Sequence, residues 1–102
     1  MIKVVEAKKK FGVVSKGDKV DLIYKLVNEG KSPLLFQKFD VACSCTSVEL
    51  PKQPTLPGDT ALIKVSFDTK SVYDRQDRIV TIYSNNKNGE IKLRFKGFVK
   101  RH

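Results

Sequence analysis

Apolar and polar residues alternate along most of this chain. In the last segment, Ile91, Leu93 and Phe95 alternate with lysine and arginine, and Gly97 and Val99 continue the same row. A strand with one buried and one solvated face has this period of two, whereas an amphipathic helix repeats its apolar residues every three to four positions. The pattern therefore predicts an all-β fold.

The alternation predicts about seven short strands. They cover residues 3–5, 11–14, 20–26, 62–67, 78–83 and 91–99, with a further extended row at Phe39, Val41, Cys43 and Cys45. Turn residues separate these segments, and the turn at 85–89 should join residues 78–84 and 90–99 in an antiparallel hairpin. Short strands with a turn every 8–12 residues are typical of a β-sandwich.

The length of 102 residues fits a single domain over residues 1–102. We expect Phe11, Tyr24, Phe39, Phe67 and Phe95, with the aliphatic residues on their faces, to form its core. No segment approaches the roughly 18–20 apolar residues of a membrane-spanning helix, so we expect no membrane span. Nothing in the pattern indicates an oligomer, and we expect a monomer.

The two cysteines, Cys43 and Cys45, are the most unusual local feature, and four interpretations of them stay open. They fit small apolar side chains facing the core, because free cysteine is commonly buried. A local disulfide is a second interpretation, although it would close a very short ring. The third is a soft-metal site, since two thiolates suit Cu(I). The fourth is a pair that cycles between dithiol and disulfide.

The chain carries 20 Lys and Arg against 11 Asp and Glu, for a net charge of +9. Lys92, Arg94, Lys96 and Phe98 should line one face of the last strand, and such a face can hold single-stranded nucleic acid. A solvated strand face kept from aggregating by lysine explains the same residues. We therefore predict no nucleic-acid ligand.

We find no convincing catalytic constellation in the sequence. Asp74 and Asp77 share a predicted loop with Arg75 and Arg78, which indicates turn chemistry and local ion pairs. The only histidine is His102, and no phosphate-binding or metalloprotease motif is present. We predict a domain that is not an enzyme and that needs no cofactor.

A set of ordered landmarks resembles the bacterial domain-of-unknown-function family 1573, common in Bacteroidetes. The landmarks run from about Lys10 to Val99 and are Phe11-Gly12, Gly17, Asn28-Glu29-Gly30, Pro33-Leu34, Cys43-Ser44-Cys45-Thr46, Pro57-Gly58, Phe67-Asp68, Ser84-Asn85 and Gly97-Phe98-Val99. Ser44 stands where the family usually has glycine. The resemblance implies an immunoglobulin-like sandwich, similar to major-sperm-protein and hydin-type domains, in an exported protein.

Most of these landmarks have a structural interpretation. Gly30 and Gly58 would free turns from the steric cost of a Cβ atom, Asn28 would bond its own turn, and Pro57 would preset φ. We also predict structural roles for Phe11, Gly12, Thr46, Asn85 and Gly97.

We predict a binding or scaffold domain of an exported bacterial protein, in the periplasm or at the cell surface, with its signal sequence upstream of Met1. Its partner would be another protein, held at a sheet edge or by end loops, because main-chain pairing gives affinity without a special motif. The alternative function is a soft-metal (copper) or redox module that uses Cys43 and Cys45.

Overall fold

The computed structural model describes residues 2–42, 44–85 and 90–101. This part of the chain forms eight strands and contains no helix, so none that could span a membrane. The strands are β1 (Ile2–Val5), β2 (Lys8–Ser15), β3 (Lys19–Asn28), β4 (Phe36–Val41), β5 (Thr46–Glu49), β6 (Thr60–Asp68), β7 (Asp74–Ser84) and β8 (Glu90–Lys100). The all-β prediction is confirmed, with eight strands in place of about seven.

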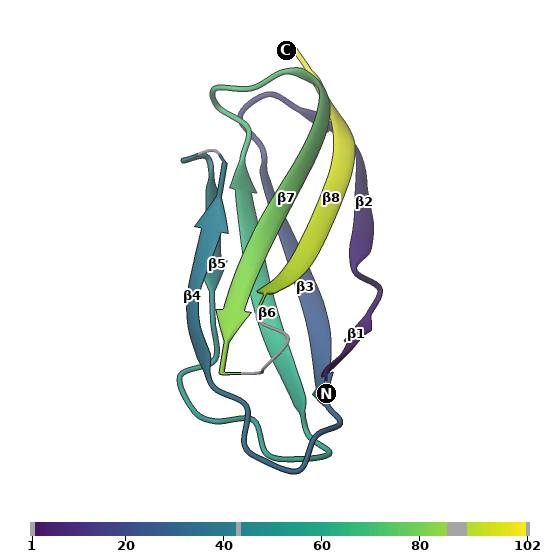
Figure 1. The fold of residues 1–102 in the computed structure, drawn as a ribbon. Helices are drawn as coiled ribbons and strands as arrows, with labels where there is room; N and C mark the ends of the chain where they lie inside the picture. Colours follow the sequence, from purple (N-terminus) through teal and green to yellow (C-terminus); the bar gives the residue numbers. More distant parts are fainter. Residues whose placement is uncertain (1, 43, 86–89, 102) are drawn as a thin grey trace.

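The strands form two four-stranded sheets that pack face to face, and the molecule is elongated, about 48 Å by 21 Å by 20 Å (Figure 1). Sheet A has the order β1-β3-β6-β5, and sheet B has the order β2-β8-β7-β4. The predicted hairpin is confirmed, because β7 and β8 pair antiparallel from Asp74–Val99 to Tyr83–Glu90. Its connecting residues 86–89 lie outside the described part of the chain.

The N-terminal segment contributes an edge strand to each sheet. β1 pairs antiparallel with β3 in sheet A, after which the chain crosses to sheet B and β2 pairs parallel with β8. The crossing is marked by a positive φ of 62° at Glu6. As a result β1 and β2 lie along one side of the sandwich, whereas β4 and β5 lie along the other (Figure 1).

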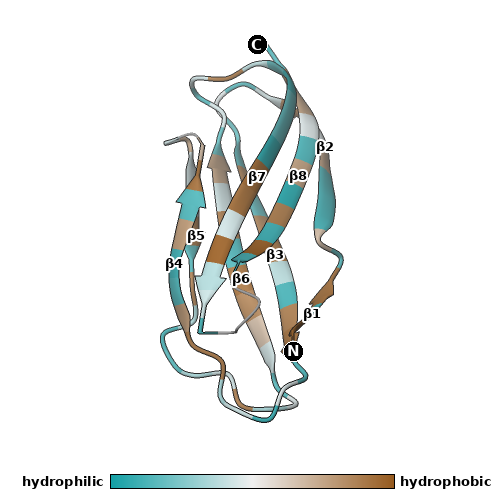
Figure 2. Ribbon diagram, viewed as in Figure 1, coloured by the Kyte–Doolittle hydropathy of each residue, from teal (hydrophilic) through white to brown (hydrophobic). Residues whose placement is uncertain are grey.

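Inward-facing side chains of both sheets form one core. Tyr24, Phe67 and Phe95 are fully buried, and the hydropathy of β7 and β8 alternates as the sequence predicts (Figure 2). Phe39 contradicts the prediction, because its side chain is 38% exposed. Phe39 pairs with the buried Ile82, but it lies on the edge strand β4, and none of the described strands covers the outer side of β4.

Asn28 connects the loops at one end of the sandwich. It is buried, its Nδ2 donates to the carbonyl oxygens of Ser32 (2.9 Å) and Thr55 (2.8 Å), and its Oδ1 accepts from the N–H of Gly30 (2.9 Å). That last bond is the local turn bond that the sequence predicts for Asn28. Gly58 has φ +87°, but Gly30 has no positive φ, so the steric argument was wrong at Gly30.

Candidate functional site

Two of the motifs that the sequence singled out lie side by side in sheet B. The pairing of β2 with β8 shifts between Lys10 and Gly12, so that Phe11 is an extra residue opposite Gly97. The Phe11 ring packs on Gly97, where a Cβ atom would overlap it. Gly12 has φ +78°, a conformation that favours glycine. This β-bulge explains why phenylalanine and both glycines are needed together.

The bulge directs Phe11 into the core and the Val13 side chain outward. The Phe11 ring centroid lies 5.8 Å from that of Phe67 and 6.2 Å from that of Phe95. Val13, which strict alternation from Phe11 would place inside, is 62% exposed instead. It lies opposite Phe98, which is 43% exposed. The bulge therefore places an apolar pair on the solvent face of sheet B.

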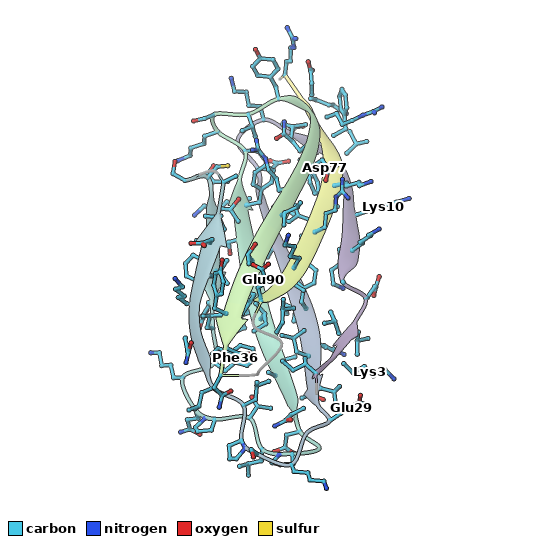
Figure 3. All side chains as sticks on the ribbon, in the orientation of Figure 1. Lys3, Lys10, Glu29, Phe36, Asp77 and Glu90 are labelled. Carbon is cyan, nitrogen blue, oxygen red and sulfur yellow. The ribbon has the colours of Figure 1, made fainter. Side chains whose placement is uncertain are left out.

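Cationic residues lie next to this apolar pair. The outward rows across β2 and β8 are Lys8 with Arg94, Lys10 with Lys96, and Val13 with Phe98. Figure 3 shows Lys10 on β2 and Asp77 on β7, which flank β8 in the upper half of the view. Like charges that lie directly opposite each other destabilise a sheet. The two cationic rows therefore have an energetic cost, which Asp77 on the other side of β8 reduces.

Asp77 forms an ion pair with one of these cations, Arg94, and lies opposite a second, Lys96. Its carboxylate accepts two bonds from Arg94, from Nε at 2.6 Å and from Nη2 at 2.5 Å. The hydrogen bond from Arg94 lowers the pKa of Asp77, and the charges of Arg94, Lys96 and Lys8 lower it further. Within the described part of the chain, no ion pair joins Lys10 or Lys96 to a carboxylate.

A groove of about 580 Å³ runs over these residues. Its lining combines the apolar pair, the bulge glycines and charged side chains of three strands, namely Lys10, Gly12, Val13, Arg75, Gln76, Asp77, Lys96, Gly97 and Phe98. We call this the basic groove. Its lining has three cations, Lys10, Arg75 and Lys96, against the one carboxylate of Asp77, beside exposed apolar surface. This combination suits a ligand that carries both carboxylates and an apolar group.

The predicted loop of aspartates and arginines is a strand. Asp74 begins β7, and its carboxylate accepts bonds from Arg101, with Nη2 at 3.0 Å. Arg78 points inward, with its guanidinium 5.8 Å from the centroid of the Phe67 ring. The expected local ion pairs were wrong, because each aspartate pairs with an arginine of another segment, Asp77 with Arg94 and Asp74 with Arg101.

The cysteine motif is only partly described, because Cys43 lies outside the described residues. Cys45 is disulfide-bonded, and its sulfur lies 3.9 Å from Oγ1 of the buried Thr46. No cluster of three or more His, Cys, Asp or Glu in the described residues could hold a metal ion. The copper or redox hypothesis for Cys43 and Cys45 stays a prediction.

The remaining landmarks lie away from the basic groove. The N–H of Gly58 donates to the carbonyl oxygen of Asn28 (2.7 Å), next to Pro57. Asn85 connects β7 to the segment before β4, because its Oδ1 accepts from the N–H of Leu35 (2.9 Å) and its Nδ2 donates to the carbonyl of Pro33 (3.1 Å). These residues shape loops and form no common site with Phe11 or Gly97.

Sequence reasoning found the charges of this face but not its groove. It placed Lys92, Arg94, Lys96 and Phe98 on one strand face, and β8 has them there. It gave no role to Lys8, Lys10 or Val13, because nothing local indicates that β2 pairs with a strand more than 80 residues away. The sequence signal for this contact was the pair of motifs Phe11-Gly12 and Gly97-Phe98-Val99, which belong to the family resemblance.

This architecture is an immunoglobulin-like β-sandwich of the kind found in PapD-like and major-sperm-protein domains. Residues 2–99 match the model of the family described as "Protein of unknown function (DUF1573)", and the chain belongs to that family. No curated protein matches the sequence.

Solved structures share the fold at low sequence identity. A protein of unknown function from Porphyromonas gingivalis W83 has a TM-score of 0.83 and 13% identity, over 95% of this chain and 46% of that one. PapD-like domain 7 of human CEP192 has a TM-score of 0.76 and 6% identity, over 99% and 86%. The YadV chaperone has a TM-score of 0.61 and 16% identity, over 98% and 51%. This chain thus spans about half of the first and third of these solved chains.

Proposed function

We propose that this domain is a non-enzymatic protein-binding module that accepts an extended segment of a partner protein at an open sheet edge. The observation that carries the proposal is the position of β2. It has eight residues and lies at the edge of sheet B, and no other strand of the described residues pairs with its outer side. An unpaired row of N–H and C=O groups is a template for an added strand.

The other edges are shorter. β1 and β5 have four residues each and β4 has six. Because the affinity of strand addition comes from main-chain hydrogen bonds, an edge of eight residues offers the most. The likeness to PapD-like and chaperone structures supports a binding domain at the level of the fold.

We further propose that the domain works outside the cytoplasm of a bacterium. The disulfide-bonded Cys45 supports this, since disulfides persist in oxidising compartments such as the periplasm. The test is fractionation of cells that express the protein with its natural upstream sequence. We expect it in the periplasmic or surface fraction, and recovery in the cytosol would contradict the proposal.

A peptide selection tests the binding mode. Peptides selected from a random library on the immobilised protein would be resynthesised with each amide N-methylated in turn. In a strand added to an edge, alternate N–H groups point toward that edge. We therefore expect N-methylation to abolish binding at every second residue and to have little effect between them. Loss without this period of two, or the failure to select any peptide, would overturn the proposal.

A further inference from the structure

The edge strand β2 begins with three lysines, Lys8, Lys9 and Lys10. Lys8 and Lys10 are exposed and point to the outer face of sheet B, where each lies opposite a cation of β8. Lys9 points the other way, and its Nζ lies 5.6 Å from the centroid of the Tyr24 ring. Two outward cations therefore lie two residues apart, which is the repeat of a strand.

The cationic excess extends beyond β2. Among the described strands, the outer face of sheet B carries eight basic side chains, which are Lys8, Lys10, Lys38, Arg75, Lys92, Arg94, Lys96 and Lys100. It carries three acidic ones, Asp40, Asp77 and Glu90. Asp77 is already engaged by Arg94. The face therefore carries an excess of positive charge and attracts anions.

Lysines on an edge strand also exclude some partners. A second copy of β2 that approached this edge would bring three lysines of its own, and the like charges would repel. An uncharged strand would gain nothing from Lys8 and Lys10. A strand with carboxylates at alternate positions would meet both of these cations and relieve the repulsion within the rows.

The apolar pair defines the next position along the edge. Val13 follows Lys10 on the same outward side because of the bulge, and Phe98 lies beside it. A partner side chain at this level would contact Val13 and the basic groove that continues over Gly97 and Arg75. An apolar side chain there would remove Val13 and Phe98 from water.

We propose that β2 is the docking edge and that its occupant is an acidic extended segment of a partner protein, with carboxylates at alternate residues facing Lys8 and Lys10 and an apolar side chain over Val13 and Phe98. This inference rests on the proposed function, since it names the edge and the chemistry of the segment that the edge accepts.

The test repeats the peptide selection on the wild type and on two double variants that remove the same charge. The test variant is Lys8→Gln with Lys10→Gln on β2, and the control is Lys25→Gln with Lys64→Gln on the exposed outer face of sheet A. Circular dichroism and thermal unfolding establish that both are folded. We expect peptides selected on the wild type to be enriched in Asp and Glu at alternate residues, and to lose about tenfold in affinity on the test variant and less than about twofold on the control.

The outcomes separate this inference from the proposed function. An alternating N-methylation pattern without acidic enrichment, or without an effect of Lys8 and Lys10, would leave edge binding in place and overturn the inference. Acidic peptides that depend on both lysines but show no alternation would overturn edge addition. Failure to select any peptide would overturn both.

Nonspecific attraction is tested in the same samples. An equal loss of affinity on the control variant would mean long-range attraction by the net charge, which overturns the inference. Single-stranded DNA that displaces the acidic peptides at equal concentration would point to a polyanion site and would also overturn it.

Discussion

The two sheets of this sandwich distribute their surface charges differently. On the outer face of sheet A, two charged pairs lie opposite each other with unlike sign, Lys19 with Asp68 and Lys64 with Glu49, and none of its described rows pairs like charges. On sheet B, Lys8 lies opposite Arg94 and Lys10 opposite Lys96, and Asp77 on the other side of β8 lies opposite Lys96. The net charge of +9 is therefore not distributed evenly over the surface. The outer face of sheet B has eight basic and three acidic side chains, an excess that attracts anions.

The two sheets also differ in regularity. The β3–β6 ladder of sheet A runs through nine consecutive pairs without a shift, whereas both edge strands of sheet B carry an irregularity. The bulge in β2 makes the exposed apolar pair and the groove. Sheet A is therefore the regular sheet, and sheet B is the irregular one that carries the exposed apolar pair and the basic groove.

The largest effect that we predict is at the bulge. Gly97→Ala places a methyl group into the Phe11 ring, and we expect it to lower the free energy of unfolding by about 2–3 kcal/mol in a denaturant titration. Gly97→Ala combined with Phe11→Leu should recover part of that loss, since the smaller side chain makes room. Wild-type stability of Gly97→Ala would contradict the close packing.

A smaller effect is expected where sheet A is hydrogen-bonded to sheet B. Tyr24 lies on β3, and its hydroxyl donates to the carbonyl oxygen of Arg94 on β8 at 2.9 Å. Tyr24→Phe should cost about 1 kcal/mol of unfolding free energy at neutral pH. Tyr73→Phe, at a side chain that is 48% exposed, is the control and should have almost no effect.

The same residue predicts a dependence on pH. Burial raises the pKa of Tyr24 to about 12 from its ordinary value near 10, so the folded state holds this proton more tightly than the unfolded chain. Its contribution to stability is fully present below pH 10 and is lost as the pH rises toward 12. We expect the wild type to lose stability more steeply than Tyr24→Phe over this range. Parallel curves would contradict the prediction.

The smallest effect tests the charge comparison itself. Lys10→Gln removes a cation from a like-charge row and should raise the free energy of unfolding by about 0.3 kcal/mol. Lys64→Gln removes the opposite charge that lies across from Glu49 and should lower it by a similar amount. High salt should reduce both differences. Denaturant titrations at two salt concentrations measure them, and changes of the same sign would refute the comparison.

The predictable part of this fold is the part with local signals. The alternation along β8 and the turn residues after β7 identified that hairpin, because both strands and their turn are continuous in sequence. β5 was missed, since Thr46–Glu49 has a single strongly apolar residue at Val48. Phe39 was placed in the core because alternation identifies a face of a strand, but not whether that strand is central or at an edge.

The site was harder to predict than the fold. Phe11-Gly12 and Gly97 were each noticed, but their contact depends on a parallel pairing between distant segments and on an extra residue in one of them. A bulge reverses the expected direction of Val13 without any mark in the sequence beyond a glycine. Long-range register of this kind requires the three-dimensional structure.

The parallel pairing of β2 with β8 also sets an order of events during folding. Among the described strands β2 pairs with β8 alone, so β2 has no place in sheet B until residues 94–100 are in position. Closing so long a loop is slow, and an early strand that waits for a late one is exposed to other chains meanwhile. The three lysines at the start of β2 disfavour association of this waiting segment with the same segment of other chains.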